Sequence, residues 1–180
     1  MIPTMTAGTI ETPRLTLRPL SSGDGDLLVH LDSDPEVMRF LTNGKPTPYD
    51  EVAAVVQRSL GHRWLAFQRA ENEFVGWFGL PPSAPGEYEL GYRLRRTSWG
   101  QGFATEGVGA LLAVAFTQLG ARRVWAQTMA VNTRSRRVME RCDMRCVRTL
   151  HEHFDDPIPG TEHGEVEYEI RCEDWQPSRP

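Results

Sequence analysis

The sequence is short of several residue types that mark particular classes of protein. Lys45 is its only lysine, and no GxxxxGK[ST] pattern surrounds it, which excludes a Walker-type ATPase. Its 3 cysteines are an odd number and too few for a secreted disulfide framework, so we expect them to be reduced. No apolar run approaches the roughly 20 residues that cross a bilayer, and the first residues lack the pattern of a signal peptide. We therefore expect a cytoplasmic protein with no membrane partner.

The charge that is present is divided unevenly along the chain. A formal net charge of −4 and a pI near 5.7 argue against nucleic acid as a partner. Arginines are concentrated between Arg134 and Arg148, whereas the stretch from Glu152 to Glu169 is acidic and contains no lysine or arginine. The basic stretch suits the phosphates of a ligand. The acidic stretch either attracts a cationic ligand or is simply a solvated loop.

Hydrophobic periodicity predicts one domain of the α/β class over residues 1–180, with residues 1–11 as a loose N-terminal segment. We predict strands near residues 12–20, 62–70, 74–80, 87–94, 123–129, 144–153 and 165–172. We predict helices near residues 22–31, 34–40, 49–60 and 104–119, and after Asn132. Residues 81–86 are rich in proline and glycine and are predicted to be a loop.

A glycine-bearing turn is predicted between the strand at 87–94 and the helix at 104–119. Gly100 and Gly102 can adopt backbone angles that other residues avoid, and they leave room for a ligand to approach the main chain. The free amides of the helix start and the positive end of its dipole suit a pyrophosphate. Thr105 stands where a dinucleotide-binding GxGxxG motif has its third glycine. The turn therefore predicts a phosphate site of another kind.

Residues 97–102 resemble the coenzyme A loop of the GNAT N-acetyltransferase superfamily, Arg/Gln-x-x-Gly-x-Gly/Ala, with Thr97 in place of Arg or Gln. Residues 99–106 are similar to the RimJ/RimL-type branch that acetylates the N-termini of ribosomal proteins. Residues 131–142 resemble the family's Asn-x-x-Ser-x-x-Val-x-Glu helix, with Asp143 where the family usually has glycine. The first and last predicted strands also resemble the branch, so that the likeness covers almost the whole chain.

The resemblance implies a mixed, mostly antiparallel twisted sheet of six to seven strands, splayed between the fourth and fifth and flanked by about four helices. It implies an acetyl-CoA-dependent N-acetyltransferase that transfers the acetyl group directly, in a ternary complex, to a primary amine. The acceptor is either a protein N-terminus or a small molecule, and the acidic stretch favours a cationic one. A homodimer is a further expectation from the family. A catalytically weak acyl-CoA-binding sensor or interaction module remains the alternative.

The resemblance also implies which residues bind acetyl-CoA. Backbone groups of Tyr92, Arg93 and Leu94 would grip the pantetheine arm where the sheet splays. The other residues expected to bind the coenzyme are Trp99, Gly100, Gln101, Gly102, Phe103, Ala104, Thr105, Asn132 and Arg136. No metal is expected, since His151, Glu152 and His153 lack a recognised zinc spacing.

Three side chains are candidates for the chemistry itself. Glu89 lies on the same strand face as Gly91, and partial desolvation at the splay would suit it as general base. Glu87, Glu167 and Glu169 are further options, and any of these acids could instead be an ordinary solvent-facing residue. The expected helix after Asn132 contains no tyrosine, so the resemblance points to Ser135 as the acid and to Asn132 as a ligand of the coenzyme or of a water. Asn132 could equally be a helix cap, and Ser135 could bind its own backbone.

Overall fold

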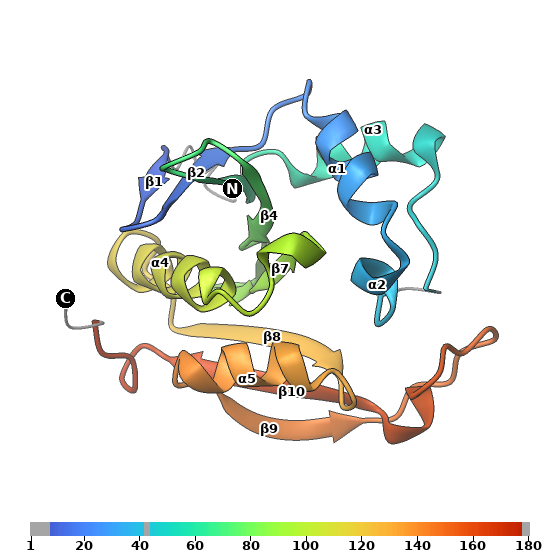
Figure 1. Ribbon diagram of the computed structural model, residues 1–180. Helices are drawn as coiled ribbons and strands as arrows, with labels where there is room; N and C mark the ends of the chain where they lie inside the picture. Colours follow the sequence, from blue (N-terminus) through green and yellow to red (C-terminus); the bar gives the residue numbers. More distant parts are fainter. Residues whose placement is uncertain (1–7, 42–43, 178–180) are drawn as a thin grey trace.

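Two five-stranded sheets form the framework of the protein in a computed structural model that describes residues 8–41 and 44–177 (Figure 1). Sheet A has the order β1 (Ile10–Glu11), β2 (Leu15–Pro19), β3 (Arg63–Gln68), β4 (Phe74–Gly79) and β7 (Gly91–Leu94). Sheet B has the order β5 (Pro82–Ala84), β6 (Glu87–Glu89), β8 (Arg123–Met129), β10 (Glu165–Arg171) and β9 (Arg145–Leu150). Neighbouring strands are antiparallel except for β6 and β8, which are parallel.

Five α-helices accompany the sheets in the described residues. They are α1 (Gly25–Asp32), α2 (Pro35–Met38), α3 (Tyr49–Ser59), α4 (Phe103–Thr117) and α5 (Thr133–Arg141). Figure 1 shows α5 lying along sheet B and the helices α1 to α3 grouped together beside sheet A. None of the helices that the structure describes is long and apolar enough to cross a membrane.

The strand predicted over residues 87–94 divides at Leu90. The sequence predicts one sheet that is splayed here, whereas the structure has two separate sheets. Its first part, β6, pairs with β8, and its second part, β7, pairs with β4. Two other boundaries differ from the sequence prediction. The predicted loop at 81–86 contains the short strand β5, and Ile10–Glu11 of the predicted loose segment pair with β2, while residues 1–7 lie outside the described part of the chain.

Two apolar clusters hold these layers together. The first lies between the inner faces of both sheets and the helices α4 and α5, and residues packed in or against it range from Ile10 to Trp175. Phe78 is fully buried there, and a Cβ on Gly107 of α4 would lie only 2.2 Å from its ring. The second cluster lies between the outer face of sheet A and the helices α1 and α3. Burying each such Leu or Phe side chain contributes about 1.5–3 kcal/mol.

Candidate active site

The predicted glycine turn adopts the backbone conformation that the sequence indicates. Gly100 and Gly102 have φ angles of 75° and 81°, in the left-handed region that glycine tolerates best. Gly102 caps α4 without a side-chain hydrogen bond, and the amide of Glu106 donates to the Gly102 carbonyl at 3.1 Å. The amides of the first helical turn therefore have no partner within the helix, and they coincide with the positive end of its dipole. This arrangement suits a phosphate group.

The turn is held in shape by contacts from outside it. The Gln101 amide Nε2 donates to the Thr97 carbonyl at 2.8 Å, and Arg14 Nη1 donates to the Gln101 carbonyl at the same distance. The indole Nε1 of Trp99 donates to the Leu94 carbonyl at 2.8 Å. Because these bonds fix the loop without a ligand, little ordering is needed when an anion binds.

The sequence analysis missed the part played by Glu106, the acid in the first turn of α4. Its carboxylate accepts hydrogen bonds from the Thr12 hydroxyl at 2.6 Å, from the Arg14 amide at 2.8 Å and from Arg14 Nε at 2.7 Å. Partial burial acts to raise the pKa of Glu106, but the bonds from Thr12 and Arg14 outweigh it and hold the pKa below its usual value. Glu106 thus ties the chain before β2 to the start of α4. Its 94-residue separation from Thr12 left no local signal in the sequence.

The two sheets part beyond Leu90, and this exposes one edge of β7. The Leu90 amide still donates to Trp125 of β8 at 2.7 Å, whereas the Arg95 amide donates to Val75 of β4 at 2.9 Å. Since successive backbone groups alternate in direction along a strand, the main chain of Tyr92 and Leu94 faces the side of the parting. The backbone of Arg93 faces β4 instead, opposite Trp77. Of the three predicted pantetheine contacts, two are thus directed to the parting.

The basic helix α5 runs beside the glycine turn. The Arg134 guanidinium lies 4.8 Å from the ring centroid of Trp99, and Cys142 at the other end of the helix lies 3.6 Å from the Thr105 carbonyl. Arg136, the predicted coenzyme contact, instead donates to the Tyr168 hydroxyl at 3.1 Å and to the Ala130 carbonyl at 3.0 Å. Of the two arginines, Arg134 therefore lies next to the loop. The run of arginines in the sequence does not by itself show which of them does so.

Ser135 and Asn132 both take part in hydrogen bonds at the start of α5. The Ser135 hydroxyl lies 2.9 Å from the Tyr92 hydroxyl, which thus reaches across the parting from β7. Burial raises the pKa of Tyr92, against the effect of its hydrogen bond with Ser135. Asn132 caps the helix, since its Oδ1 accepts from the Ser135 amide at 3.3 Å while its Nδ2 donates to Thr128 at 3.0 Å. The expected tyrosine was sought on α5, but Tyr92 lies on β7. A motif on the helix therefore gives no sign of it.

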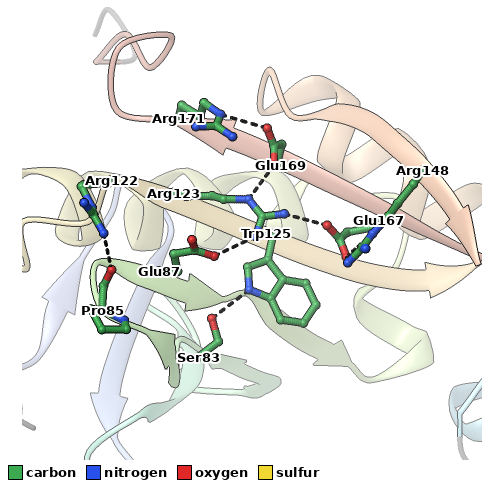
Figure 2. A network of polar contacts seen from close by, with 10 residues as sticks. All are labelled: Ser83, Pro85, Glu87, Arg122, Arg123, Trp125, Arg148, Glu167, Glu169 and Arg171. Atoms are coloured by element: carbon green, nitrogen blue, oxygen red, sulfur yellow. Dashed lines mark hydrogen bonds and ion pairs between the residues drawn. The ribbon is translucent and has the colours of Figure 1, made fainter.

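Glu89 differs from the other candidate bases. Its side chain is exposed on the outer face, yet the surrounding protein removes enough water to raise its pKa, with burial as the only cause. The three other candidates are all ion-paired to Arg123, as Figure 2 shows, at 2.8 Å for Glu87, 2.6 Å for Glu167 and 2.5 Å for Glu169. Glu167, which is only 3% exposed, also accepts from Arg148. Glu89 is not ion-paired to Arg123, and its raised pKa suits a base at neutral pH.

Other features of the surface lie apart from this arrangement. A hollow of about 400 Å³ is lined by Thr16, Phe67 and their neighbours, and one of about 270 Å³ is lined by residues of α1 and by Arg95 to Thr97. Neither is lined by Glu89 or by the glycines of the turn. Within residues 8–41 and 44–177 no group of three or more His, Cys, Asp or Glu side chains could hold a metal ion.

Comparisons with known proteins give this geometry a family. Residues 14–145 match the family described as "Acetyltransferase (GNAT) domain". The "FsC-acetyl coenzyme A-N(2)-transacetylase" of Aspergillus fumigatus is 37% identical over 184 residues, which cover 93% of this chain and 77% of that protein. The "Uncharacterized N-acetyltransferase p20" of Bacillus licheniformis is 32% identical over 71% of this chain and 76% of its own.

Solved structures share the fold. A GNAT-family acetyltransferase from Bacillus anthracis has a TM-score of 0.76 at 26% identity, covering 92% of this chain and 99% of its own. A RimL ribosomal L7/L12 α-N-protein acetyltransferase in complex with coenzyme A has a TM-score of 0.75 at 19% identity, covering 91% and 97% of the two chains. The predicted fold class is thereby confirmed, as is the enzyme class. The chain belongs to the GNAT acetyltransferase family and is an acetyl-CoA-dependent N-acetyltransferase.

Proposed function

We propose that the protein acetylates the primary amine of a small molecule by direct transfer from acetyl-CoA, with Glu89 as the general base. The observation that carries the role of Glu89 is the contrast with Glu87, Glu167 and Glu169, whose carboxylates are paired with Arg123. A small-molecule acceptor is supported by the similarity to the A. fumigatus N(2)-transacetylase. The likeness to the RimL acetyltransferase, at 19% identity, supports the fold alone, so a protein N-terminus is the second candidate.

In the proposed reaction Glu89 takes a proton from the acceptor ammonium group, directly or through a water. The coenzyme supplies the activated acetyl thioester. The neutral nitrogen forms the new C–N bond as the C–S bond breaks, and the departing sulfur leaves as a thiolate. Ser135, whose hydroxyl is paired with that of Tyr92, gives a proton to this thiolate and takes up the second proton that the nitrogen loses as it becomes an amide, so that the serine hydroxyl is restored. Glu89 comes from β6 and Ser135 from α5, so the proposed base and the proposed acid belong to separate elements.

The same proposal assigns the coenzyme to the residues around the glycine turn. The amides from Phe103 to Thr105 bind the pyrophosphate, and Arg134 adds a charged side chain beside Trp99. The Tyr92 main chain at the open edge of β7 contacts the pantetheine arm, and its amide is suited to stabilise the charge that develops on the carbonyl oxygen. Asn132 acts chiefly as the cap that places Ser135.

A thiol-release assay with acetyl-CoA tests this function. The acceptor panel contains small amines, polyamines, aminoglycosides and short peptides with free N-termini. We expect Glu89→Gln to lower kcat about 10²- to 10⁴-fold with an unchanged Kd for coenzyme A, because general-base catalysis is lost while the glycine turn is intact. Glu87→Gln is the matched control on the same strand and keeps its turnover. A Glu89→Gln enzyme as active as wild type, or release only with peptides, would overturn the proposal.

The pH dependence gives an independent check on Glu89. The base works in its deprotonated form, and its pKa is raised in the folded protein. Activity should therefore rise with pH along an acidic limb centred above about 4.3, the ordinary value for glutamate. Measuring kcat/KM between pH 4 and 9 locates this limb in the free enzyme. A limb that persists unchanged in Glu89→Gln would assign it to another group.

A further inference from the structure

Arg63 is a half-buried arginine on the outer face of sheet A, two strands away from β7, whose first residue Gly91 follows Glu89 by two positions in the sequence. It is the first residue of β3, and the register places it opposite Gly79 of β4, which in turn lies opposite Gly91 of β7. The indole of Trp77 lies close to both glycines, because a Cβ on Gly79 or Gly91 would be 3.5 or 3.4 Å from the indole edge. The Arg63 guanidinium lies over that indole, 3.9 Å from the ring centroid.

The guanidinium of Arg63 has no carboxylate of its own. Asp32 of α1 is the acid whose charge acts on Arg63, but both of its carboxylate oxygens are used elsewhere. Its Oδ1 accepts from Arg93 and its Oδ2 accepts from the Thr47 hydroxyl. No ion pair of Arg63 occurs within 4.0 Å among residues 8–41 and 44–177, and Arg93 also has a buried Nε without a hydrogen-bond partner in the structure. Two guanidinium groups therefore share one carboxylate beside Trp77, and the local charge is positive.

This surplus of positive charge has an energetic cost in the protein without an acceptor. Burial and the charge of Arg93 lower the pKa of Arg63 to about 10, and Asp32 compensates only in part. A half-buried cation that is not neutralised within the protein is stabilised when an anion from outside approaches it. A guanidinium offers parallel N–H donors that match a carboxylate, and the half-buried indole of Trp77 offers an apolar contact for the carbon chain attached to it.

We propose that Arg63, supported by Arg93, binds a carboxylate on the acceptor, so that the substrate class of this enzyme is an amine that also carries an acidic group. The inference rests on the proposed function, because it places the amine at Glu89. Glu89 ends β6 and Gly91 begins β7, two residues later in the sequence, and the three neighbouring strands β3, β4 and β7 span about 10 Å. The anion and the amine of the proposed acceptor are therefore separated by a short carbon chain. Glu167 and Glu169 of the acidic stretch are ion-paired to Arg123, Arg148 and Arg171, so these two acids do not supply a site for a cationic acceptor.

Paired acceptors test the substrate class. Amino acids with one to five carbons between amine and carboxylate are compared with their carboxamides in the thiol-release assay. We expect wild-type kcat/KM to favour a carboxylate over its carboxamide at least tenfold, and Arg63→Met to abolish that preference while Kd for coenzyme A stays unchanged. Arg63→Lys keeps the charge and retains part of the preference. Arg69→Gln, which removes an exposed arginine just beyond the other end of β3, is the matched control and leaves the preference intact.

A binding measurement separates this inference from the proposed function. The Arg63 side-chain NMR signal is titrated with butyrate and with butyramide in the presence of coenzyme A. Saturable shifts with butyrate but not with butyramide support the anion site. If these shifts occur and no amine in the panel is acetylated, the proposed function fails while the anion site stands. Turnover that does not distinguish carboxylate from carboxamide, together with an Arg63 signal that butyrate leaves unmoved, overturns the inference and leaves the proposed function standing.

Discussion

Two arginines that begin strands, Arg123 of β8 and Arg63 of β3, are both half-buried but have opposite surroundings. Arg123 donates to three carboxylates, those of Glu87, Glu167 and Glu169. Arg63 lies over an indole and within the electrostatic influence of a second arginine, Arg93. Strand register explains much of the difference, because Arg123 lies opposite Glu87 whereas Arg63 lies opposite Gly79. The same residue type is thus an internal link in sheet B and a free cation in sheet A.

The comparison extends to the outer faces of the two sheets. Apolar residues such as Leu65 and Phe67 cover much of the outer face of sheet A and pack against α1 and α3. The outer face of sheet B is held by the arginine and glutamate network of Figure 2, which joins β6, β8, β9 and β10. Glu167 and Glu169, two acids of the stretch from 152 to 169, thus hold strands together.

Breaking the network of sheet B has the largest expected effect on stability. Arg123→Met leaves Glu167, which is 3% exposed, with Arg148 as its remaining partner, so the free energy of unfolding should fall by about 3 kcal/mol. Urea unfolding followed by circular dichroism measures the change. Arg171→Met, which removes an exposed partner of Glu169, is the control and should cost less than about 1 kcal/mol. Equal effects of the two variants would contradict the account of a network centred on Arg123.

Arg18 of sheet A forms a tight ion pair with Asp24 at 2.6 Å, and its removal has the next largest effect. The hydrogen bond from Arg18 and those from Ser21 lower the pKa of Asp24 to about 2, against the effect of burial. A carboxyl with a lowered pKa stabilises the fold above its unfolded pKa and loses this contribution as pH falls. Asp24→Asn should therefore reduce stability by about 2 kcal/mol at pH 7, and by progressively less from about pH 4 toward pH 2. A difference from wild type that does not change with pH would refute this origin.

The smallest expected effect has the opposite sign and sharpens the contrast between the two arginines. Arg63→Met removes a cation whose pKa is lowered to about 10, and with it a penalty present at neutral pH that fades as pH rises above that value. Loss of the contact with Trp77 offsets part of the gain. We expect the free energy of unfolding at pH 7 to rise by about 1 kcal/mol. A loss as large as that of Arg123→Met would show that Arg63 is a structural link as well.

Much of the local structure could be predicted from the sequence. The left-handed glycines at 100 and 102, the start of α4 and the Asn132 cap follow from preferences of single residues and their immediate neighbours. Helical and strand periodicity located the elements to within a few residues. The family motifs lie on these same elements. A phosphate-binding turn is formed by one short segment, so its residues are neighbours in the sequence as well as in the structure.

Only the tertiary structure decided which side chains meet. The pairing of Tyr92 with Ser135 spans 43 residues, and that of Thr12 with Glu106 spans 94. The sequence favoured Glu89 as the base and left Glu87, Glu167 and Glu169 as further options. The register of β6, β8 and β10 then brought three of them to Arg123 and left Glu89 apart. Periodicity fixes the face on which a side chain lies, but its pKa and its partners depend on charges that other strands bring near it.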